Sequence, residues 1–281
     1  MVKIISDSSC DLSKEIIEKY NITILPLHIH LGEMEYEDGV NITPDEIYQW
    51  AEANKTTPKT SVPSIAEAAE IMKQYASDEI ICFSISEDMS SSANVMRLAA
   101  QELDIEDRVH VIDSRNLSTG IGLLVIEAAV MAQQGKRAEE IVAKIQQLIP
   151  RVRASFVVDT LTYLHRGGRC SSVAALAGGA LKLHPKIVVE NGKMGANKKY
   201  RGKMGSVILS YAKDLEEDLK NAKKDRVFIT HSGCDTDIIE SVREYLESLN
   251  KFDEILETRA GGVISSHCGP GTLGVLFIKG E

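Results

Sequence analysis

Residues 79–103 read EIICFSISEDMSSSANVMRLAAQEL, and this stretch decides the fold class. It begins with a short apolar run, continues through a serine-rich loop, and ends in a segment whose apolar residues recur at helical spacing. A buried strand followed at once by an amphipathic helix is the repeating unit of a parallel α/β sheet. The same unit recurs on either side of this stretch.

The first half of the chain alternates strand-like and helix-like segments. Capping boxes, in which a glutamate follows three residues after the cap, predict helix starts at Thr43 and Ser64. The alternation predicts a Rossmann-like, doubly wound parallel sheet with helices on both faces over residues 1–153. The segments are VKIISDSS (2–9), SKEIIEKY (13–20), RVHVIDS (108–114), TGIGLLVIEAAVMAQQG (119–135) and AEEIVAKIQQLIPRV (138–152).

The second half of the chain, residues 154–281, has a different pattern. ASFVVDT (154–160) is strand-like, and Asn191-Gly192 is a strong hairpin signal between two further strand-like runs. Helical patterns at 205–221 and 237–250 flank the strand-like RVFITHSG (226–233). We therefore expect a second α/β domain with a mixed sheet.

Length and cysteine usage are consistent with an ordinary protein of a reducing compartment. The 281 residues exceed what one compact core usually holds, which also favours two domains. The five cysteines are scattered without a C-x-x-C pair, which disfavours a disulfide framework and a structural zinc site. No charged-then-apolar leader opens the chain, and the longest apolar run is interrupted by Glu127. We expect a cytoplasmic protein.

The charge of the chain is negative overall but uneven. A net charge of −9 disfavours nucleic acid as a partner. Residues 151–205 nevertheless contain 11 Lys and Arg and only 2 Asp and Glu. Such a basic segment fits a docking surface for an anionic partner, and equally well a solvated face without a partner.

Three loops rich in hydroxyl groups each lie beside a helix-like segment: SDSSCD (6–11), KTSVPS (59–64) and SISEDMSSS (84–92). Ligands of parallel α/β sheets bind where strands end, and the free N–H groups of helix starts favour an anion there. Ser90, Ser91 and Ser92 are therefore candidates to hold a carboxylate or phosphate. Alternatively these serines only cap helices, which is their more frequent role.

Motifs for nucleotide binding through a glycine-rich loop, for a serine nucleophile elbow and for a zinc protease are absent. His28 and His30 stand two apart on a predicted strand, and without a third ligand nearby we expect a solvent-facing pair rather than a metal site. A nucleophilic Ser90 would need a histidine in reach, and His267 qualifies only through the fold. Cys268 pairs poorly with His267, because neighbours on an extended chain point in opposite directions.

Seven motifs follow one another in a characteristic order: SDSSCDL, TSVPS, ISEDMSSS, VIDS, LHRGGR, KYRG and AGGVISSHCGPGTLG. In these motifs the chain resembles the DegV family, which includes the fatty acid-binding subunits of bacterial fatty acid kinase. The resemblance covers essentially the whole chain and implies an acyl chain buried between or beneath two α/β domains. It further implies a separate ATP-dependent, dihydroxyacetone-kinase-like subunit that converts the bound fatty acid to an acyl phosphate for phospholipid synthesis.

The resemblance also implies a binding site. The family patterns T-S-Q-P-S, S-G-T and H-T-G-P-G fall on residues 60–64, 90–92 and 267–271. His267 would form a hydrogen bond with Thr60 and contact the head group. Arg169 and Arg201 match basic positions near the pocket mouth that face the kinase. No metal or cofactor is implied besides the fatty acid, and any membrane contact would be peripheral. The residues implied to bind the carboxylate are Thr60, Ser61, Ser90, Ser91, Ser92 and His267.

The chain departs from the family patterns at four positions, Val62, Ser91, Ser92 and Cys268. The change from glycine to Ser91 matters most, because glycine permits close backbone approach and unusual φ values.

Candidate lining for the acyl chain comes from residues 171–183 (SSVAALAGGALKL) and 120–130 (GIGLLVIEAAV), although each is also a plausible core helix. A second hypothesis from a different class is a serine-dependent acyl hydrolase or transferase that uses Ser90 and His267.

Overall fold

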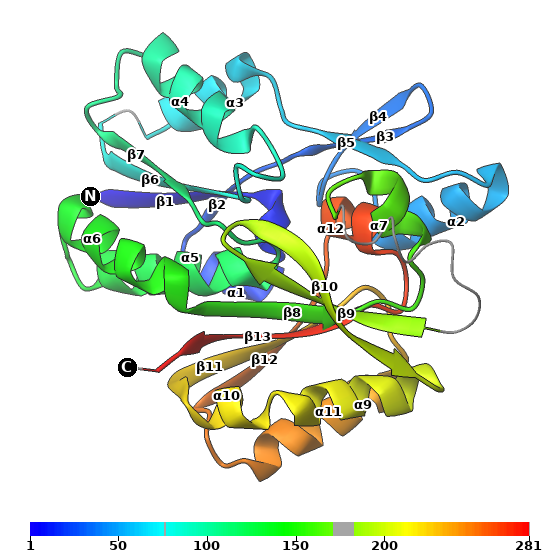
Figure 1. The fold of residues 1–281 in the computed structure, drawn as a ribbon. Coiled ribbons are helices and arrows are strands. Elements are labelled where there is room, and N and C mark those ends of the chain that lie inside the picture. Colours follow the sequence, from blue (N-terminus) through cyan, green and yellow to red (C-terminus); the bar gives the residue numbers. More distant parts are fainter. Residues whose placement is uncertain (76, 171–182, 281) are drawn as a thin grey trace.

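The computed structural model describes residues 1–75, 77–170 and 183–280. Its N-terminal sheet has the strand order β2-β1-β6-β7, and all of its pairings are parallel. Helices α3 (Ile65–Lys73) and α4 (Ser92–Glu102) cover one face, and α5 (Thr119–Gln133) and α6 (Ala138–Leu148) cover the other (Figure 1). The predicted parallel sheet with helices on both faces is confirmed. Its strands are β1 (Val2–Asp7), β2 (Thr23–Leu25), β6 (Glu79–Ser84) and β7 (Val109–Asp113).

Strand β6 shows why this sheet forms from short apolar runs. Ile80 and Cys82 pack with α3 and α4, whereas Ile81 and Phe83 pack with α5 and α6. A strand buried on both faces is apolar at nearly every position, as in parallel sheets generally. The loops after these strands carry the 3-10 helix η1 (Ser8–Cys10) and helix α1 (Lys14–Lys19).

A small antiparallel sheet, which the sequence does not predict, follows β2. It has the order β4-β3-β5 and consists of β3 (His28–Leu31), β4 (Met34–Glu37) and β5 (Lys59–Ser61). Helix α2 (Pro44–Asn54) connects β4 to β5. The capping boxes predicted at Thr43 and Ser64 are both present, at the starts of α2 and α3.

The larger sheet is six-stranded and mixed, as predicted, with the order β10-β9-β8-β13-β11-β12. Only β11 and β12 are parallel neighbours. Asn191 and Gly192 have φ values of 52° and 85°, as the predicted two-residue hairpin between β9 and β10 requires. Helices α9 (Met204–Asp214), α10 (Glu216–Lys220) and α11 (Thr236–Ser248) cover its outer face. The strands are β8 (Val152–Val157), β9 (Leu183–Glu190), β10 (Lys193–Arg201), β11 (Ala222–His231), β12 (Glu254–Arg259) and β13 (Leu273–Lys279).

Helix α5 lies between the two large sheets (Figure 1). Every residue from Thr119 to Ile126 is buried, so this helix has no hydrophilic face over its first two turns. A helix that is apolar all round must be covered on all sides, here by one sheet above and the other below. The core therefore runs continuously from the first sheet to the second. Strand β8 begins at Val152, and the domain boundary expected between residues 153 and 154 stays a prediction.

Two short helices lie between the small sheet and the larger sheet, α7 (Thr162–Gly167) and α12 (Gly262–Cys268). The prediction of an extended turn through His267 and Cys268 is wrong, because these residues form the last turn of α12. The turn begins only at Gly269, whose φ is 74°. Val263 and Ile264 are buried in α12, which packs against α2 and α7.

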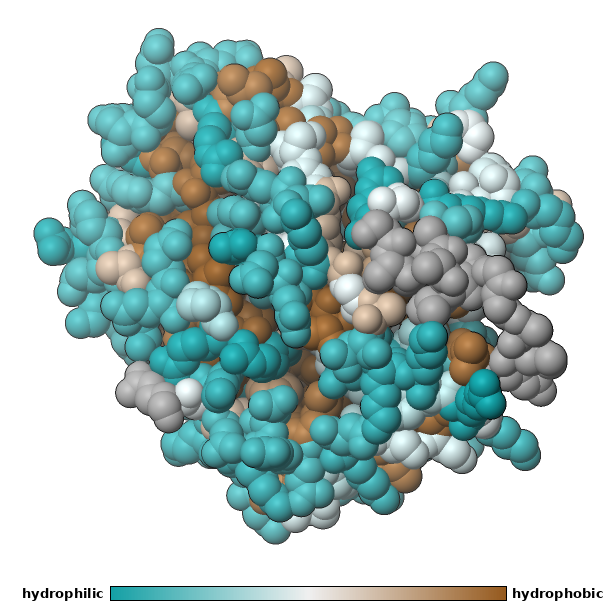
Figure 2. Space-filling model, in the orientation of Figure 1, coloured by the Kyte–Doolittle hydropathy of each residue, from teal (hydrophilic) through white to brown (hydrophobic). Residues whose placement is uncertain are grey.

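None of the helices in the described residues is both long enough and apolar enough to span a bilayer. Figure 2 shows mainly hydrophilic side chains on one face of the molecule, with apolar surface in gaps between them. The large hydrophobic residues that are exposed in the described chain are separate from one another in the sequence: Met1, Met34, Val40 and Leu98.

The buried position of α5 predicts that truncating a leucine there lowers the free energy of unfolding more than truncating an exposed leucine does. Leu124→Ala in α5 removes a side chain that is 0% exposed, and we expect a loss of about 2–5 kcal/mol in the free energy of unfolding. Leu98→Ala in α4 is the matched control, since Leu98 is 37% exposed, and should cost less than about 1 kcal/mol. Urea unfolding curves measure both values, and equal losses would contradict the buried position of α5.

Candidate functional site

A cavity of about 250 Å³ lies where loops of the N-terminal sheet meet β5, β10 and α12. One part of its wall is polar and consists of Thr60, Ser61, Ser90, Ser91, Arg169 and His267. The rest is apolar and consists of Leu27, Val62, Ile85, Met89, Leu117, Met194, Val263, Ile264 and Cys268. A concave apolar space with a few convergent polar groups is the usual form of a small-molecule site.

Thr60 and His267 form the central polar contact of this cavity. Thr60 lies in β5, where it pairs with Ile29 of the small sheet, and His267 lies in the last turn of α12. Thr60 Oγ1 and His267 Nε2 are 2.8 Å apart, although 207 positions separate the two residues in the sequence. The hydrogen bond that the family resemblance implies is therefore present, and its role in binding stays a prediction.

The imidazole of His267 is held in its neutral form. Burial, together with the nearby positive charge of Arg169, lowers the pKa of His267 to about 4. Nδ1 is buried and has no hydrogen-bond partner among the described residues. A Cβ atom on Gly167 would lie 2.4 Å from this nitrogen, so only glycine fits there. This contact explains the first glycine of the LHRGGR motif.

Ser90 and Ser91 line the cavity, but Ser92 does not. Ser92 is fully buried and its Oγ donates a 2.7 Å hydrogen bond to Asp7 Oδ2, away from the cavity. Its backbone N–H points to Ser90 Oγ at 3.3 Å. Ser91 has a φ of −89°, which any residue adopts, so replacing the family's glycine causes no backbone strain here.

The two candidate arginines occupy different places. Arg169 lines the cavity, is exposed, and donates from Nη1 to the Gly167 carbonyl at 2.6 Å. Arg201 is exposed at the end of β10 and does not line the cavity. Of the proposed apolar lining, residues 171–182 lie outside the described residues, and residues 120–130 pack in α5 between the sheets rather than on the cavity wall.

Several lining residues could not be predicted from the sequence, because segments far apart supply them. Met194 reaches the cavity from β10, and the tip of the β9–β10 hairpin is fixed to loops of the N-terminal sheet. Ser86 Oγ donates to the Gly192 carbonyl at 2.7 Å, and Arg115 Nη2 donates to the Asn191 carbonyl at 2.9 Å. No local sequence signal indicates this docking.

The geometry offers little for nucleophilic catalysis. His267 Nε2 is bonded to Thr60, and no hydrogen bond joins Ser90 to a histidine in the part of the chain that the structure describes. Burial raises the pKa of Cys268 to about 12, so its thiol stays protonated at neutral pH. The wall is suited to holding a polar group by neutral donors.

One cluster within the described residues has side chains that could hold a metal ion, formed by His28, Glu37 and Glu67 with ligand atoms within 4.8 Å of one another. The predicted solvent-facing pair is wrong for His28, which is 9% exposed because β4, β5 and α3 surround it. Its Nδ1 contacts Glu35, and its Nε2 lies 3.4 Å from Glu67. Both ring nitrogens thus have carboxylate partners, and we assign no ion.

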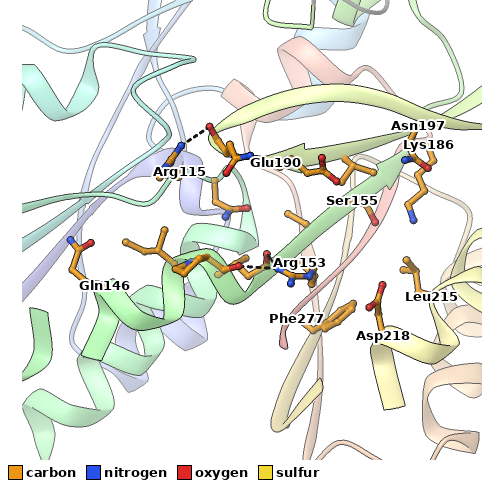
Figure 3. A pocket seen from close by; sticks show the side chains of 18 residues that line it. Arg115, Gln146, Arg153, Ser155, Lys186, Glu190, Asn197, Leu215, Asp218 and Phe277 are labelled. Atoms are coloured by element: carbon orange, nitrogen blue, oxygen red, sulfur yellow. Dashed lines mark hydrogen bonds between the residues drawn. The ribbon is translucent and has the colours of Figure 1, made fainter. Parts of the chain in front are cut away.

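A second, larger cleft of about 620 Å³ runs beside β8 and the end of β9 (Figure 3). Its wall is of mixed charge, with Arg115, Arg153 and Lys186 opposed by Glu190 and Asp218. The guanidinium groups already have carbonyl partners, at Asn191 for Arg115 and at Pro150 and Val152 for Arg153. Size alone therefore does not make this cleft the better candidate site.

Comparison with known proteins places these features in context. A family model described as "Uncharacterised protein, DegV family" matches residues 1–280. A DegV domain-containing protein of Caldanaerobacter subterraneus is 31% identical, over 98% of each chain. A DegV family protein of Thermus thermophilus described as binding fatty acid has a TM-score of 0.91 at 29% identity, over 99% of each chain. A stearic acid-binding protein of Eubacterium ventriosum has a TM-score of 0.86 at 33% identity, over 99% of this chain and 98% of that one.

The neutral state of His267 predicts a pH effect on stability. Its pKa is lower in the folded chain, about 4, than its ordinary value of about 6.5, so the unfolded chain binds the proton more readily. The stability contributed by this difference is present above pH 6.5 and is lost as the pH falls toward 4. Between pH 7 and pH 5 we expect wild type to lose about 1–2 kcal/mol more than His267→Gln.

Urea unfolding of both proteins at the two pH values measures this difference. An equal loss in the free energy of unfolding of wild type and variant would show that His267 is not held neutral by the fold.

Proposed function

This chain belongs to the DegV family, and from its cavity we propose that it binds a long-chain fatty acid beside Thr60 and His267. The observation that carries the proposal is the wall of that cavity, which joins neutral hydroxyl and imidazole groups to an apolar remainder. The relatives described as binding fatty acid or stearic acid, with chains that match this one almost end to end, support the same ligand class.

A hydrogen-bond relay would hold the carboxylate. A buried N–H without an acceptor is rarer and more costly than a buried lone pair, so the proton of His267 belongs on Nε2, and Nδ1 is left bare. His267 then donates to Thr60 Oγ1, whose own hydroxyl proton is free to donate to a ligand. Ser61, Ser90 and Ser91 add neutral hydroxyl groups along the same wall.

The acyl chain would supply most of the affinity. Each buried CH₂ contributes about 0.8 kcal/mol, so burial of about ten methylenes offsets much of the free-energy cost of association. The apolar wall beyond Thr60 includes two flexible methionines, Met89 and Met194, which adapt to chains of different shape.

We further propose that the bound acid is substrate for a separate ATP-dependent kinase and that this chain is not itself catalytic. Neutral donors leave a carboxylate oxygen nucleophilic. That oxygen would attack the γ-phosphorus of ATP, whose bond to the bridging oxygen breaks to release ADP and form the acyl phosphate. The partner would supply ATP and magnesium, since the sequence has no phosphate-binding loop of its own. The exposed Arg169 and Arg201 are the proposed contacts for a kinase of the dihydroxyacetone-kinase type.

The proposed setting is the cytoplasm, with at most peripheral contact with a membrane for phospholipid synthesis. Cys10, Cys82, Cys234 and Cys268 are free thiols, which is consistent with a reducing compartment.

Extraction of the native protein tests the ligand class. Mass spectrometry of the denatured protein should find a co-purified fatty acid, and added palmitate or oleate should raise the melting temperature of stripped protein. Thr60→Val should weaken binding about 10-fold, as loss of a hydrogen bond to a charged group does, while Thr56→Val, at an exposed threonine, should bind like wild type.

The absence of both co-purified acid and thermal protection would overturn the proposal. Hydrolysis of an acyl ester or acyl phosphate by the purified chain alone, abolished in Ser90→Ala, would instead support the hydrolase hypothesis.

A further inference from the structure

Three aspartates are buried behind the cavity without lining it. Asp7, Asp11 and Asp38 are 0%, 5% and 2% exposed, and none of them forms an ion pair with Lys or Arg within the described residues. Burying a carboxylate is costly unless hydrogen-bond donors surround it. The N–H groups and hydroxyls that surround them come from the start of α12 and from the loops that follow β1, β6 and β7. Two of these segments, α12 and the loop after β6, carry His267 and the serines of the polar wall.

Asp11 and Asp38 hold the start of α12. Asp11 Oδ1 accepts the N–H of Gly261 at 2.8 Å, and Asp38 Oδ1 accepts the N–H of Gly262 at 2.6 Å. The second oxygen of each carboxylate accepts a serine hydroxyl from the N-terminal half, Ser118 for Asp11 at 2.5 Å and Ser8 for Asp38 at 2.7 Å. Each aspartate therefore bridges α12 to the loops of the first sheet.

The glycines of the AGGVISSH motif make this close approach feasible. A Cβ atom on Gly261 would lie 3.2 Å from carboxylate oxygens of both Asp11 and Asp38. A Cβ atom on Gly262 would lie 2.4 Å from Ile29 and 3.0 Å from Asp38. These contacts fix the place where α12 begins. His267 lies at the other end of the same seven-residue helix.

Asp7 holds the opposite side of the cavity. Its Oδ2 accepts the N–H of Ile85 at 2.9 Å and the hydroxyl of Ser92 at 2.7 Å, and its Oδ1 accepts the hydroxyl of Ser9. Ile85 and Ser92 are the two ends of the loop that carries Ser90 and Ser91. One carboxylate thus fixes both ends of the serine loop.

We propose that Asp7, Asp11 and Asp38 are positioning residues, which set the distance between the serine loop and His267 and so the geometry of the head-group site. The proposal rests on the proposed function for its effect on binding, but the placement of His267 can be measured without a ligand. Aspartate suits the role because each carboxyl oxygen can accept from a different segment. An asparagine could reproduce it, with its carbonyl toward α12 and its amide toward Ser8, whereas alanine could not.

The test compares Asp38→Ala with the conservative Asp38→Asn in the full-length protein. We expect Asp38→Ala to raise the Kd for cis-parinaric acid at least 10-fold and to shift the imidazole NMR signals of His267, assigned with His267→Gln. Asp38→Asn should stay within about 3-fold of wild type, with the His267 signals restored. Tyr211→Phe is the matched control, because Tyr211 is also fully buried and bonded, to Ser155, but lies on the outer face of the larger sheet.

A merely structural role would lower the melting temperature of Asp38→Ala and Tyr211→Phe alike while leaving Kd within 2-fold and the His267 signals in place, and that result would overturn the proposal. If Asp38→Ala does not fold, Ser8→Ala, which removes one of the donors that hold Asp38, should raise Kd about 3-fold and shift the same signals; unchanged values would again overturn it. If wild type binds no fatty acid, the proposed function fails, and the His267 signals alone decide the positioning role.

Discussion

The hydrogen bonds from the start of α12 to Asp11 and Asp38 are the constraint on which the candidate site depends. They join residues that are 250 and 224 positions apart in the sequence. Because α12 is only seven residues long, it has little intrinsic tendency to form alone. Its helical form and the place of His267 both follow from acceptors that the N-terminal half provides.

The layered architecture explains how residues so far apart in the sequence are held at hydrogen-bonding distance. Helix α5 is buried between the two large sheets, so the sheets are packed through a common core rather than joined by a flexible linker. The loops of the first sheet, the hairpin tip at Gly192 and helix α12 then meet at a fixed place. The polar and apolar walls of the cavity, which these three parts form, therefore keep fixed positions relative to each other.

The architecture could be predicted from the sequence where the evidence for it is local. Strand β6 is apolar at successive positions because both its faces are buried, and the capping boxes at Thr43 and Ser64 and the hairpin at Asn191-Gly192 need only neighbouring residues. Helix α12 escaped prediction because glycines and serines dominate GGVISSHC, and its N-terminal hydrogen bonds go to distant aspartates. The orientation of the Ser92 side chain could not be predicted for a similar reason, since its hydroxyl binds a buried carboxylate and does not face the cavity.

The Thr60–His267 contact has a consequence for the making of the protein. A ribosome that has added residue 260 has produced the parallel sheet and the small antiparallel sheet of the N-terminal half, and every strand of the larger sheet except β13, but α12 has not yet been made. The cavity therefore forms only after α12 has been made, because α12 supplies its contacts of largest sequence separation, from Gly261 to Asp11 and from His267 to Thr60. A chain interrupted before that point would expose the apolar wall to water, and a bound lipid would mark a molecule in which α12 had been made and had packed against the loops of the first sheet.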